Sequence, residues 1–431
     1  DHDEKALRFE IGAVWRDQLK EAEAAMAVYR EMMERFPDDV RIYDELANLH
    51  LQAEAWVELS AVLSRKLRTL ADRADAEPTQ LADLHCKLGM LEFGRAGDVG
   101  AAVSHYSDAL ATDPECDLAI RNLEELLADE AHQEEIARSL EPVYVRRGQH
   151  QELADVLEIQ LEGAGKRQRD KLLTRLIPLY RDHCGDPERA LHTASRLFAM
   201  KPKHKGLQET IEALATELGE YEHLADLYEL YVDEIDKSAI QLHIYFTVAR
   251  AAHEHLANHE RAERNYLAVL EIDPSHVDAL DHLETLYLED EQPEKLLGIL
   301  RKKESLAESD AARIDFRFQT ASILADQLGR LDEAIDDMRA VLGLSQRHPD
   351  ALERLDVLFQ RSEHWEDLHD ILVIRVEEAL SDEIRASLLY RLGSLREERL
   401  DDVHSAIETY AEILEIDLVH PDCVGALERL F

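Results

Sequence analysis

The chain has 431 residues, and its 49 Lys and Arg stand against 92 Asp and Glu, which gives a formal net charge of −43. This balance argues against a nucleic-acid binder, which needs cations to neutralise phosphates, and against a protein held on an anionic membrane by a basic patch. Gly (16) and Pro (11) are scarce relative to average usages of about 7% and 5%, while 45% of residues are apolar. These values predict a folded, turn-poor and mainly helical chain.

Cellular context is indicated by what the sequence lacks. No apolar run approaches the ~20 residues of a membrane span, and the start shows no signal-peptide pattern. Four cysteines lie far apart in the sequence without a CxxC pair, which favours free thiols in a reducing compartment: Cys86, Cys116, Cys184 and Cys423. We therefore expect a cytoplasmic protein without membrane insertion. Because the chain begins with Asp1 rather than Met, we also expect a fragment or a processed product.

One pattern recurs six times along the chain: an Ala, an aromatic or apolar residue four positions later, and a Pro further on. The alanines are Ala25, Ala102, Ala190, Ala262, Ala334 and Ala406. Their spacings are 77, 88, 72, 72 and 72 residues, so the unit, which we call a repeat, has 72 residues. Such fixed periods are the signature of repeat architectures. The repeats are expected to start near residues 5, 82, 170, 242, 314 and 386.

Each repeat is predicted to hold four helices, taken here in chain order. The first has apolar residues 18, 14 and 11 positions before the Ala, as in Leu388, Leu392 and Leu395, which form one helix face. The second carries the Ala and starts at an N-cap residue four positions earlier, such as Asp98. The recurrent Pro is predicted to end this helix, because the residue before Pro avoids the α region.

The third helix is expected just past the Pro, and the fourth is marked by Trp56-x2-Leu59 and Trp365-x2-Leu368. A column of small residues 13 positions before the Ala, such as Gly12, is predicted to face that Ala and allow close helix packing. The residues beyond 72 in the first two intervals are assigned to a polar loop around 71–80 and to an additional helix near 134–145. Strand-like alternation is absent, so residues 1–431 are predicted to form one continuous all-α array.

These offsets resemble the tetratricopeptide repeat. The resemblance is carried by Gly393-x-Leu395, by Ala406-x3-Tyr410 and by an Ala-to-Pro interval of 12 in four repeats. It implies a right-handed α-solenoid of helix pairs, whose first helices line a concave groove, and a non-enzymatic protein that holds peptides or partner domains. The second pair departs from the family where the family has Gly, since this column reads Ala47, Glu124, Glu212, Glu284, Asp356 and Glu428.

Two acidic columns are the candidate binding residues, because the resemblance places both on groove-facing positions. The column eight before the Ala contains Asp17, Asp182, Glu254, Asp326 and Glu398, with Gly94 in the second repeat. The column nineteen after the Ala contains Asp44, Glu209, Asp281 and Glu353. Such a surface would steer and hold a basic partner. The alternative is a solvated acidic face, since about a fifth of all residues are acidic.

An aromatic column lies sixteen positions before the Ala. It places Phe246, Phe318 and Tyr390 in three consecutive repeats, where the resemblance again implies a groove-facing position. These residues are predicted to form an apolar strip for a partner. The alternative is partial burial against the neighbouring helix.

Catalytic and metal chemistry find little support in the sequence. It has no Gly-rich phosphate loop, no G-x-S-x-G and no H-E-x-x-H motif, so we expect no enzyme and no cofactor. The densest histidine cluster is His253, His255 and His259, in which the last two are four residues apart and could share a metal. Because a zinc site normally needs three or four converging ligands, no metal site is assigned.

The first functional interpretation is a scaffold or adaptor that binds a partner protein or peptide in an acidic concave groove. The alternatives are a chaperone-like binder of basic proteins and the regulatory repeat arm of a larger enzyme or signalling protein. A further expectation concerns the last repeat, where no fourth helix follows the third. A longer repeat protein, or a second copy of this chain, is expected to cover the apolar residues Val424, Leu427, Leu430 and Phe431.

Overall fold

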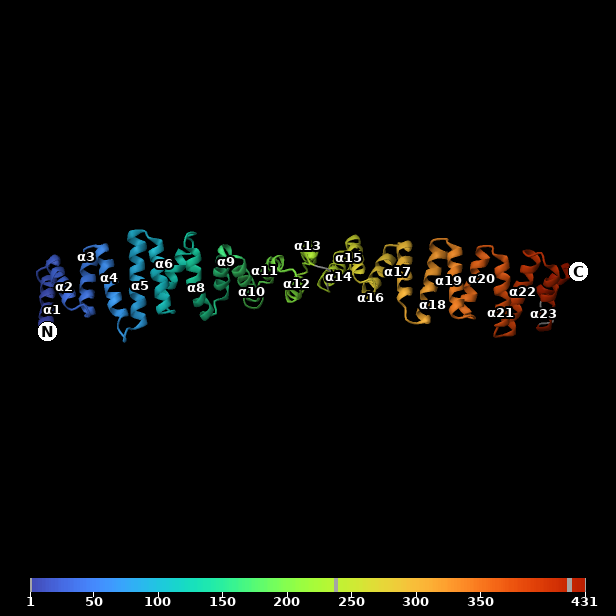
Figure 1. Cartoon of the computed structure of the whole chain (residues 1–431), viewed down its shortest axis with the longest axis horizontal. Coiled ribbons are helices and arrows are strands. Elements are labelled where there is room, and N and C mark those ends of the chain that lie inside the picture. Colours follow the sequence, from blue (N-terminus) through green and yellow to red (C-terminus); the bar gives the residue numbers. More distant parts are fainter. Residues whose placement is uncertain (1, 236–238, 417–420, 431) are drawn as a thin grey trace. The chain divides into compact units, whose positions relative to one another are not determined.

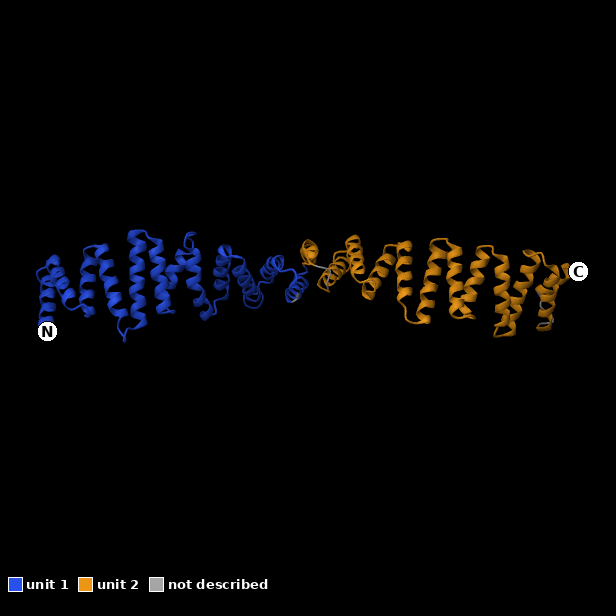
Figure 2. Cartoon of the chain, viewed as in Figure 1, with its two compact units in different colours: residues 1–219 blue, residues 220–431 orange. Residues whose placement is uncertain are grey.

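The protein is all-α, as predicted. The computed structural model describes residues 2–235, 239–416 and 421–430, which form 24 α-helices and contain no strand (Figure 1). None of these helices is both long and apolar enough to cross a membrane. The chain divides into two compact units, Asp1–Gly219 and Glu220–Phe431 (Figure 2). The predicted continuity of the array from residue 1 to 431 stays a prediction.

The first compact unit contains twelve α-helices in its described residues. These are α1 (His2–Asp17), α2 (Ala22–Arg35), α3 (Val40–Gln52), α4 (Trp56–Ala71), α5 (Pro78–Leu91), α6 (Val99–Thr112), α7 (Asp117–Leu126), α8 (Gln133–Arg147), α9 (His150–Gly163), α10 (Lys166–Pro178), α11 (Pro187–Met200) and α12 (Lys205–Leu218). Short π-helical turns extend α5 and α10 and are called η1 (Glu92–Ala96) and η2 (Leu179–Cys184).

The second compact unit likewise contains twelve α-helices in its described residues. These are α13 (Tyr221–Tyr231), α14 (Ala239–Glu254), α15 (His259–Ile272), α16 (Val277–Glu289), α17 (Pro293–Leu306), α18 (Asp310–Ser322), α19 (Leu331–Leu344), α20 (Pro349–Arg361), α21 (Trp365–Glu377), α22 (Asp382–Glu398), α23 (Val403–Ile416) and α24 (Pro421–Leu430). A 3₁₀ turn follows α13 and a π-helical turn follows α18; they are η3 (Val232–Glu234) and η4 (Ile323–Gln327).

The helices follow the predicted order of four per repeat, with one exception. Helix α9 begins with His150-x2-Leu153, in the manner of α4 with Trp56-x2-Leu59, so α9 is the fourth helix of the second repeat. Helix α8 is therefore the inserted one, and it covers the segment where an additional helix is expected. The repeats correspond to α1–α4, α5–α9, α10–α13, α14–α17, α18–α21 and α22–α24.

The second helices start at the predicted caps. In four repeats the cap side chain accepts a hydrogen bond from a backbone N–H three residues later, at 2.9–3.1 Å. These caps are Asp98, Asp186, Asn258 and Asp402. Glu21 and Arg330 occupy the same position without a side-chain cap bond. Capping by Asp and Asn satisfies backbone donors that have no partner within the helix.

Close packing within the helix pairs differs in one respect from the prediction. All six alanines of the pattern are fully buried, as predicted. The small column, however, faces the tyrosine one turn beyond the Ala, because the ring lies across the first helix and fills the space there. A Cβ atom at Gly12 would come within 2.5 Å of the Tyr29 ring. The same distance is 2.6 Å between Gly89 and Tyr106, and 2.5 Å between Gly393 and Tyr410.

The recurrent prolines have two different roles. In the first four repeats the second helix ends two residues before the Pro, as at Arg35 and Pro37, which matches the prediction. In the last two repeats the prediction is wrong, because Pro349 and Pro421 are the first residues of α20 and α24. Proline suits a first helical position, where its missing N–H needs no partner. There the Pro begins the third helix instead of ending the second.

The core consists of local clusters shared by neighbouring helices, rather than one central core. One such cluster joins α1, α2 and α3 around Ala25, and another extends from α18 to α22 around Ala334. This is the packing of an α-solenoid. At α24, Leu427 and Leu430 are half-buried against the cluster around Ala406, and Val424 is 37% exposed. Phe431 lies outside the described residues.

Candidate binding cavity

The predicted acidic columns lie at the ends of the first helices and along the third helices. All nine acidic residues are exposed. Five of them are paired with a nearby cation, which the sequence pattern did not reveal: Asp17 with Arg16, Asp44 with Lys66, Asp182 with Arg181, Asp281 with Lys303, and Asp326 with Arg354 and Arg361. The other four are Glu209, Glu254, Glu353 and Glu398.

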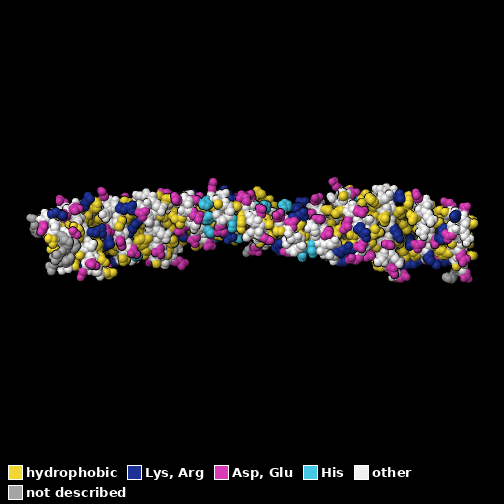
Figure 3. All heavy atoms as spheres, turned by 180° about the vertical axis from the view of Figure 1, so that it is seen from behind, with side chains coloured by type: hydrophobic (Ala, Val, Ile, Leu, Met, Phe, Trp, Pro, Cys, Tyr) yellow, Lys and Arg dark blue, Asp and Glu magenta, His cyan; other side chains and the backbone are white. Residues whose placement is uncertain are grey.

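Asp326 illustrates this neutralisation. Its two carboxylate oxygens lie 2.6 Å from Arg354 and 2.8 Å from Arg361. The hydrogen bond from Arg361, followed by that from Arg354, holds the pKa of this carboxyl below its ordinary value. Lys and Arg side chains are interspersed with Asp and Glu on the face drawn in Figure 3. The net charge of −43 therefore does not translate into unpaired acid at every position of the columns.

The three candidate aromatic residues are half-buried, and each packs within its own repeat. The Phe246 ring centroid lies 5.9 Å from that of Tyr266. Phe318 lies 5.5 Å from His348, and Tyr390 lies 5.8 Å from Tyr410. Partial burial against neighbouring helices, the alternative considered for this column, accounts for these contacts. A continuous apolar strip stays a prediction.

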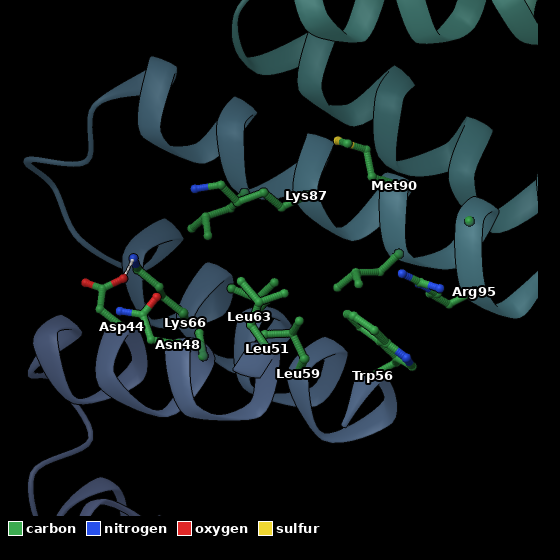
Figure 4. Close-up of a pocket in the computed structure, with 14 residues that line it drawn as sticks. Asp44, Asn48, Leu51, Trp56, Leu59, Leu63, Lys66, Lys87, Met90 and Arg95 are labelled. Carbon is green, nitrogen blue, oxygen red and sulfur yellow. Dashed lines mark hydrogen bonds and ion pairs between the residues drawn. The ribbon is translucent and has the colours of Figure 1, made fainter. Parts of the chain in front are cut away.

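A cavity of about 680 Å³ opens between α3, α4 and α5 (Figure 4). Its apolar wall includes the buried Leu59, Leu63 and Leu84, together with Leu51 and Met90, which are 52% and 51% exposed. The remaining lining residues are Asp44, Ala47, Asn48, Trp56, Lys66, Lys87, Leu91, Gly94 and Arg95.

The two ends of the cavity are polar and its middle is apolar (Figure 4). Lys66, Lys87 and Asn48 lie at one end, where the Lys66 ammonium donates to Asp44. At the other end the Arg95 guanidinium lies 4.2 Å from the centroid of the Trp56 ring. The site therefore offers apolar surface beside cations in a strongly acidic chain.

An equivalent but smaller cavity, of about 250 Å³, lies between α20, α21 and α22. Nine of its ten lining residues occupy repeat positions that also line the larger cavity: Gln360, Trp365, Leu368, Leu372, Arg391, Ser394, Leu395, Glu398 and Arg399. The tenth, Tyr390, occupies the position of the buried Cys86, which does not line the larger cavity. The stacking of arginine on tryptophan recurs, with Arg399 4.6 Å from the Trp365 centroid.

The difference in size has two causes. First, Tyr390 and Glu398 stand where the second repeat has Cys86 and Gly94, so larger side chains fill the smaller cavity. Second, the buried Asp356 occupies the position of Ala47.

Asp356 is 1% exposed and accepts hydrogen bonds from two arginines. Arg391 donates to its two oxygens at 2.8 and 2.5 Å, and Arg375 donates to one of them. The equivalents of these arginines in the larger cavity are Lys66 and Lys87. Both cations are thus kept in the larger cavity, while the carboxylate between them is absent.

Three of the candidate residues from the sequence line these two cavities. Asp44 lines the larger cavity, and Tyr390 and Glu398 line the smaller one. The lysines and the Trp–Arg pairs were missed, because core packing was taken to explain the recurrent tryptophans. The available signal was Ala47, the only non-acidic member of its column.

Two of the cysteines, which are far apart in the sequence, lie close together in the fold. Cys86 is fully buried, and its Sγ lies 3.6 Å from that of Cys116 at the start of α7. Burial raises the pKa of the Cys86 thiol. Thirty residues of sequence separate the two thiols, but the packing of α5 against α7 brings them together.

Comparisons with known proteins give fold-level likeness only. No family model and no curated protein matches the chain. Among solved structures, Naa15/Naa10 bound to HypK-THB is similar over 99% of this chain and 61% of that chain, with 17% identity and a TM-score of 0.28. This chain therefore spans less than two thirds of that structure's length.

Two smaller structures are similar over parts of the chain. YrrB, a TPR protein with an unusual peptide-binding site, covers 47% of this chain and 99% of its own, with 17% identity and a TM-score of 0.27. The MamA protein covers 41% and 92%, with 18% identity and a TM-score of 0.26. At these TM-scores the likeness carries no argument by itself. The buried alanines and the Gly–Tyr contacts of the helix pairs show an all-α helical repeat protein.

Proposed function

We propose that the protein is a non-enzymatic scaffold that binds partner polypeptides, and that the cavity between α3, α4 and α5 is one of its binding sites. One observation carries this proposal. The cavity is largely apolar and contains Lys66 and Lys87, but it has Ala47 at the position where the other five repeats have Asp or Glu. Its volume of about 680 Å³ falls within the range of ligand pockets, roughly 300–1,000 Å³. Solenoid repeats also provide the extended surfaces on which partners bind.

The equivalent cavity indicates the chemistry of the partner. Asp356 lies between Arg375 and Arg391, so a carboxylate from outside would suit the space between Lys66 and Lys87. Leu51 and Met90 beside this space would take up a bulky apolar side chain. The proposed ligand is a partner segment in which Asp or Glu lies next to a large apolar residue.

Ala47→Glu tests this site, because it would restore the missing carboxylate from within the chain. The probe is a set of labelled peptides containing Glu-Leu or Glu-Phe, compared with Lys-Leu and Lys-Phe counterparts by fluorescence anisotropy. The glutamate peptides should bind, and Ala47→Glu should weaken their binding at least tenfold, which is about 1.4 kcal/mol. Gln52→Glu is the matched control, since it adds the same charge to α3 outside the cavity. Equal weakening of glutamate-peptide binding by both variants, or no weakening by Ala47→Glu, would refute the site.

A second part of the proposal concerns a basic segment of a partner in the acidic groove. Among the described residues, neither Glu353 nor Glu398 is paired with Lys or Arg, and Glu398 lines the smaller cavity. The strong net charge would speed the approach of a basic partner and make binding sensitive to salt.

Charge reversal tests the basic-segment proposal. Glu353→Lys with Glu398→Lys should weaken the binding of Lys-rich peptides, and raised salt should weaken binding to the unchanged protein. Asp326→Asn is the control, because Arg354 and Arg361 already neutralise that carboxylate. If every basic peptide binds equally, a chaperone-like binder of basic proteins replaces the scaffold. If the charge reversal has no effect, the groove assignment fails.

A further inference from the structure

The fourth repeat brings two histidines and a carboxylate to one point. His253 lies near the end of α14, His259 is the first residue of α15, and Glu289 is the last residue of α16. In a stack of helices joined by short turns, the end of the first helix, the start of the second and the end of the third lie at the same edge. The His253 Nε2 atom is 3.0 Å from a Glu289 oxygen, and the two imidazole centroids are 5.6 Å apart.

The three side chains converge closely enough to share an ion. One donor atom from each of them lies within 4.8 Å of the other two. Nitrogen and oxygen ligands bind Zn²⁺ at about 2.0–2.2 Å, so two ligand atoms in a tetrahedral site lie roughly 3.4 Å apart. The Nε2 atom of His253 and a carboxylate oxygen of Glu289 are already 3.0 Å apart. Small rotations of the His259 imidazole would bring its ligand nitrogen to a similar distance from both.

The surroundings of the histidines provide an independent argument. The Nδ1 atom of His259 lies 2.6 Å from Asp290, which is the residue after Glu289. A carboxylate on one ring nitrogen fixes the orientation of an imidazole and leaves the other nitrogen available to a metal. The Nδ1 atom of His253 is buried and has no hydrogen-bond partner among the described residues. One ring is therefore oriented by a carboxylate, and the other has an unsatisfied nitrogen.

We propose that His253, His259 and Glu289 bind one divalent transition-metal ion of the Zn²⁺ class, with Asp290 orienting His259. This site is unrelated to the proposed binding of polypeptides, and it would fasten α14, α15 and α16 to one another. Water would complete the coordination, as it does when a protein supplies three ligands to zinc. The sequence pointed to His255 and His259 as a ligand pair, whereas the structure brings His253 and His259 together. The ring of His255 instead stacks on Tyr221, with centroids 3.7 Å apart.

The experiment titrates the metal-free full chain with Co²⁺, whose visible spectrum reports the ligand set, and with Zn²⁺ by calorimetry. His259→Ala and the conservative Glu289→Gln should each remove one equivalent of bound metal or weaken it at least tenfold. Asp290→Asn should weaken binding by about 10–100-fold, the range found for residues that orient metal ligands. Zn²⁺ should raise the midpoint of thermal unfolding of the unchanged protein, but not of His259→Ala.

His255→Ala is the matched control, since this histidine lies two residues from His253 and outside the trio. It should bind Co²⁺ with the spectrum and stoichiometry of the unchanged protein. His85→Ala is the second control, because His85, His105 and Asp108 form the other three-residue cluster among the described residues. Binding that survives His259→Ala and Glu289→Gln, or that is lost equally in either control, would overturn the proposal. Failure to bind either ion would also overturn it and would leave the peptide-binding cavity unaffected.

Discussion

A glycine opposite a tyrosine sets the separation of the helices in three of the repeats. At Gly393 a Cβ atom would lie 2.5 Å from the Tyr410 ring, closer than side chains can approach. The third repeat has the sizes exchanged, with Ile177 in the small column and Ala194 in the tyrosine column. Both residues are buried there. The total volume of the two columns is thus kept while its division between the helices varies.

Gly393→Ala should destabilise the protein by about 1–3 kcal/mol, because the added methyl group overpacks the pair. When Tyr410 is also replaced by Ala, Gly393→Ala should have little further effect on the free energy of unfolding. The two substitutions should therefore show a coupling energy of at least about 0.5 kcal/mol. Urea unfolding followed by circular dichroism measures both effects. Gly298→Ala in α17 is the control, since a Cβ there meets nothing within 4 Å. It should stabilise the helix by roughly 0.5–1 kcal/mol, and equal losses in the two variants would refute the packing argument.

The pH dependence of stability should report the ion pairs of Asp326. Its folded-state pKa lies below the ordinary value of 3.8, mainly because of Arg361. A carboxyl with a lowered folded pKa contributes stability above its unfolded pKa, and this contribution is lost as the pH falls through the folded value. Because the side chain is 43% exposed, the contribution is less than about 1 kcal/mol.

Asp326→Asn should therefore lower the unfolding midpoint at pH 6 and lower it less near pH 2. Thermal unfolding at the two pH values measures the difference. Asp315→Asn, at another exposed carboxylate on the preceding helix α18, is the control and should change neither value. An Asp326→Asn effect that is the same at both pH values would contradict an ionic origin.

At the scale of helices, the Asp356 network joins α20, α21 and α22. Asp356→Ala should destabilise the protein by about 2 kcal/mol, because it leaves Arg375 and Arg391 without their buried acceptor. This is less than the 3–5 kcal/mol of a fully buried pair, since the arginine side chains are 21% and 40% exposed. Chemical unfolding measures the loss. The control is Glu353→Ala, an exposed carboxylate on the same helix, which should change stability by less than about 0.5 kcal/mol.

The helices and their caps were predictable from the sequence because each depends on neighbouring residues. Asp98 lies at the predicted start of its helix and caps it. The burial of Ala102 could be predicted from the spacing of the repeat alone. The cavity was not predictable in the same way. It depends on Ala47, Lys66 and Lys87, which come from three helices and differ from their repeat equivalents by single substitutions. Periodicity reports what repeats share, whereas this site results from what they do not share.

The prolines show the same limit at the ends of helices. Pro37 and Pro349 belong to one column of the pattern, but the first follows a helix and the second begins one. The longer interval of 15 residues before Pro349 was the available signal. A shift of three residues moves Pro from the turn into the next helix, where the missing N–H is harmless.

At the scale of the whole molecule, each compact unit contains its own clusters of buried side chains. The described residues of the second unit include clusters around Tyr266, Ala334 and Ala406. Residues 220–431 expressed alone should therefore keep their helical circular dichroism and unfold cooperatively. Calorimetry of this fragment and of the full chain tests the prediction, because the full chain should show a transition within a few degrees of that of the fragment. An unfolded fragment would instead favour one continuous array that folds only as a whole.

Ala47 has a consequence for how such a protein acquires a binding site. The codons for Ala differ from those for Asp and Glu in the middle base, so one nucleotide change separates the two states of this column. If one copy of a duplicated repeat lost its internal carboxylate, the cations that neutralised it would stay in place, because the packing of their own helices holds them. Loss of that carboxylate then leaves a cationic recess without any new residue being added. A solenoid can in this way gain a specific binding site through the loss of one side chain in one repeat, while the other repeats keep the fold unchanged.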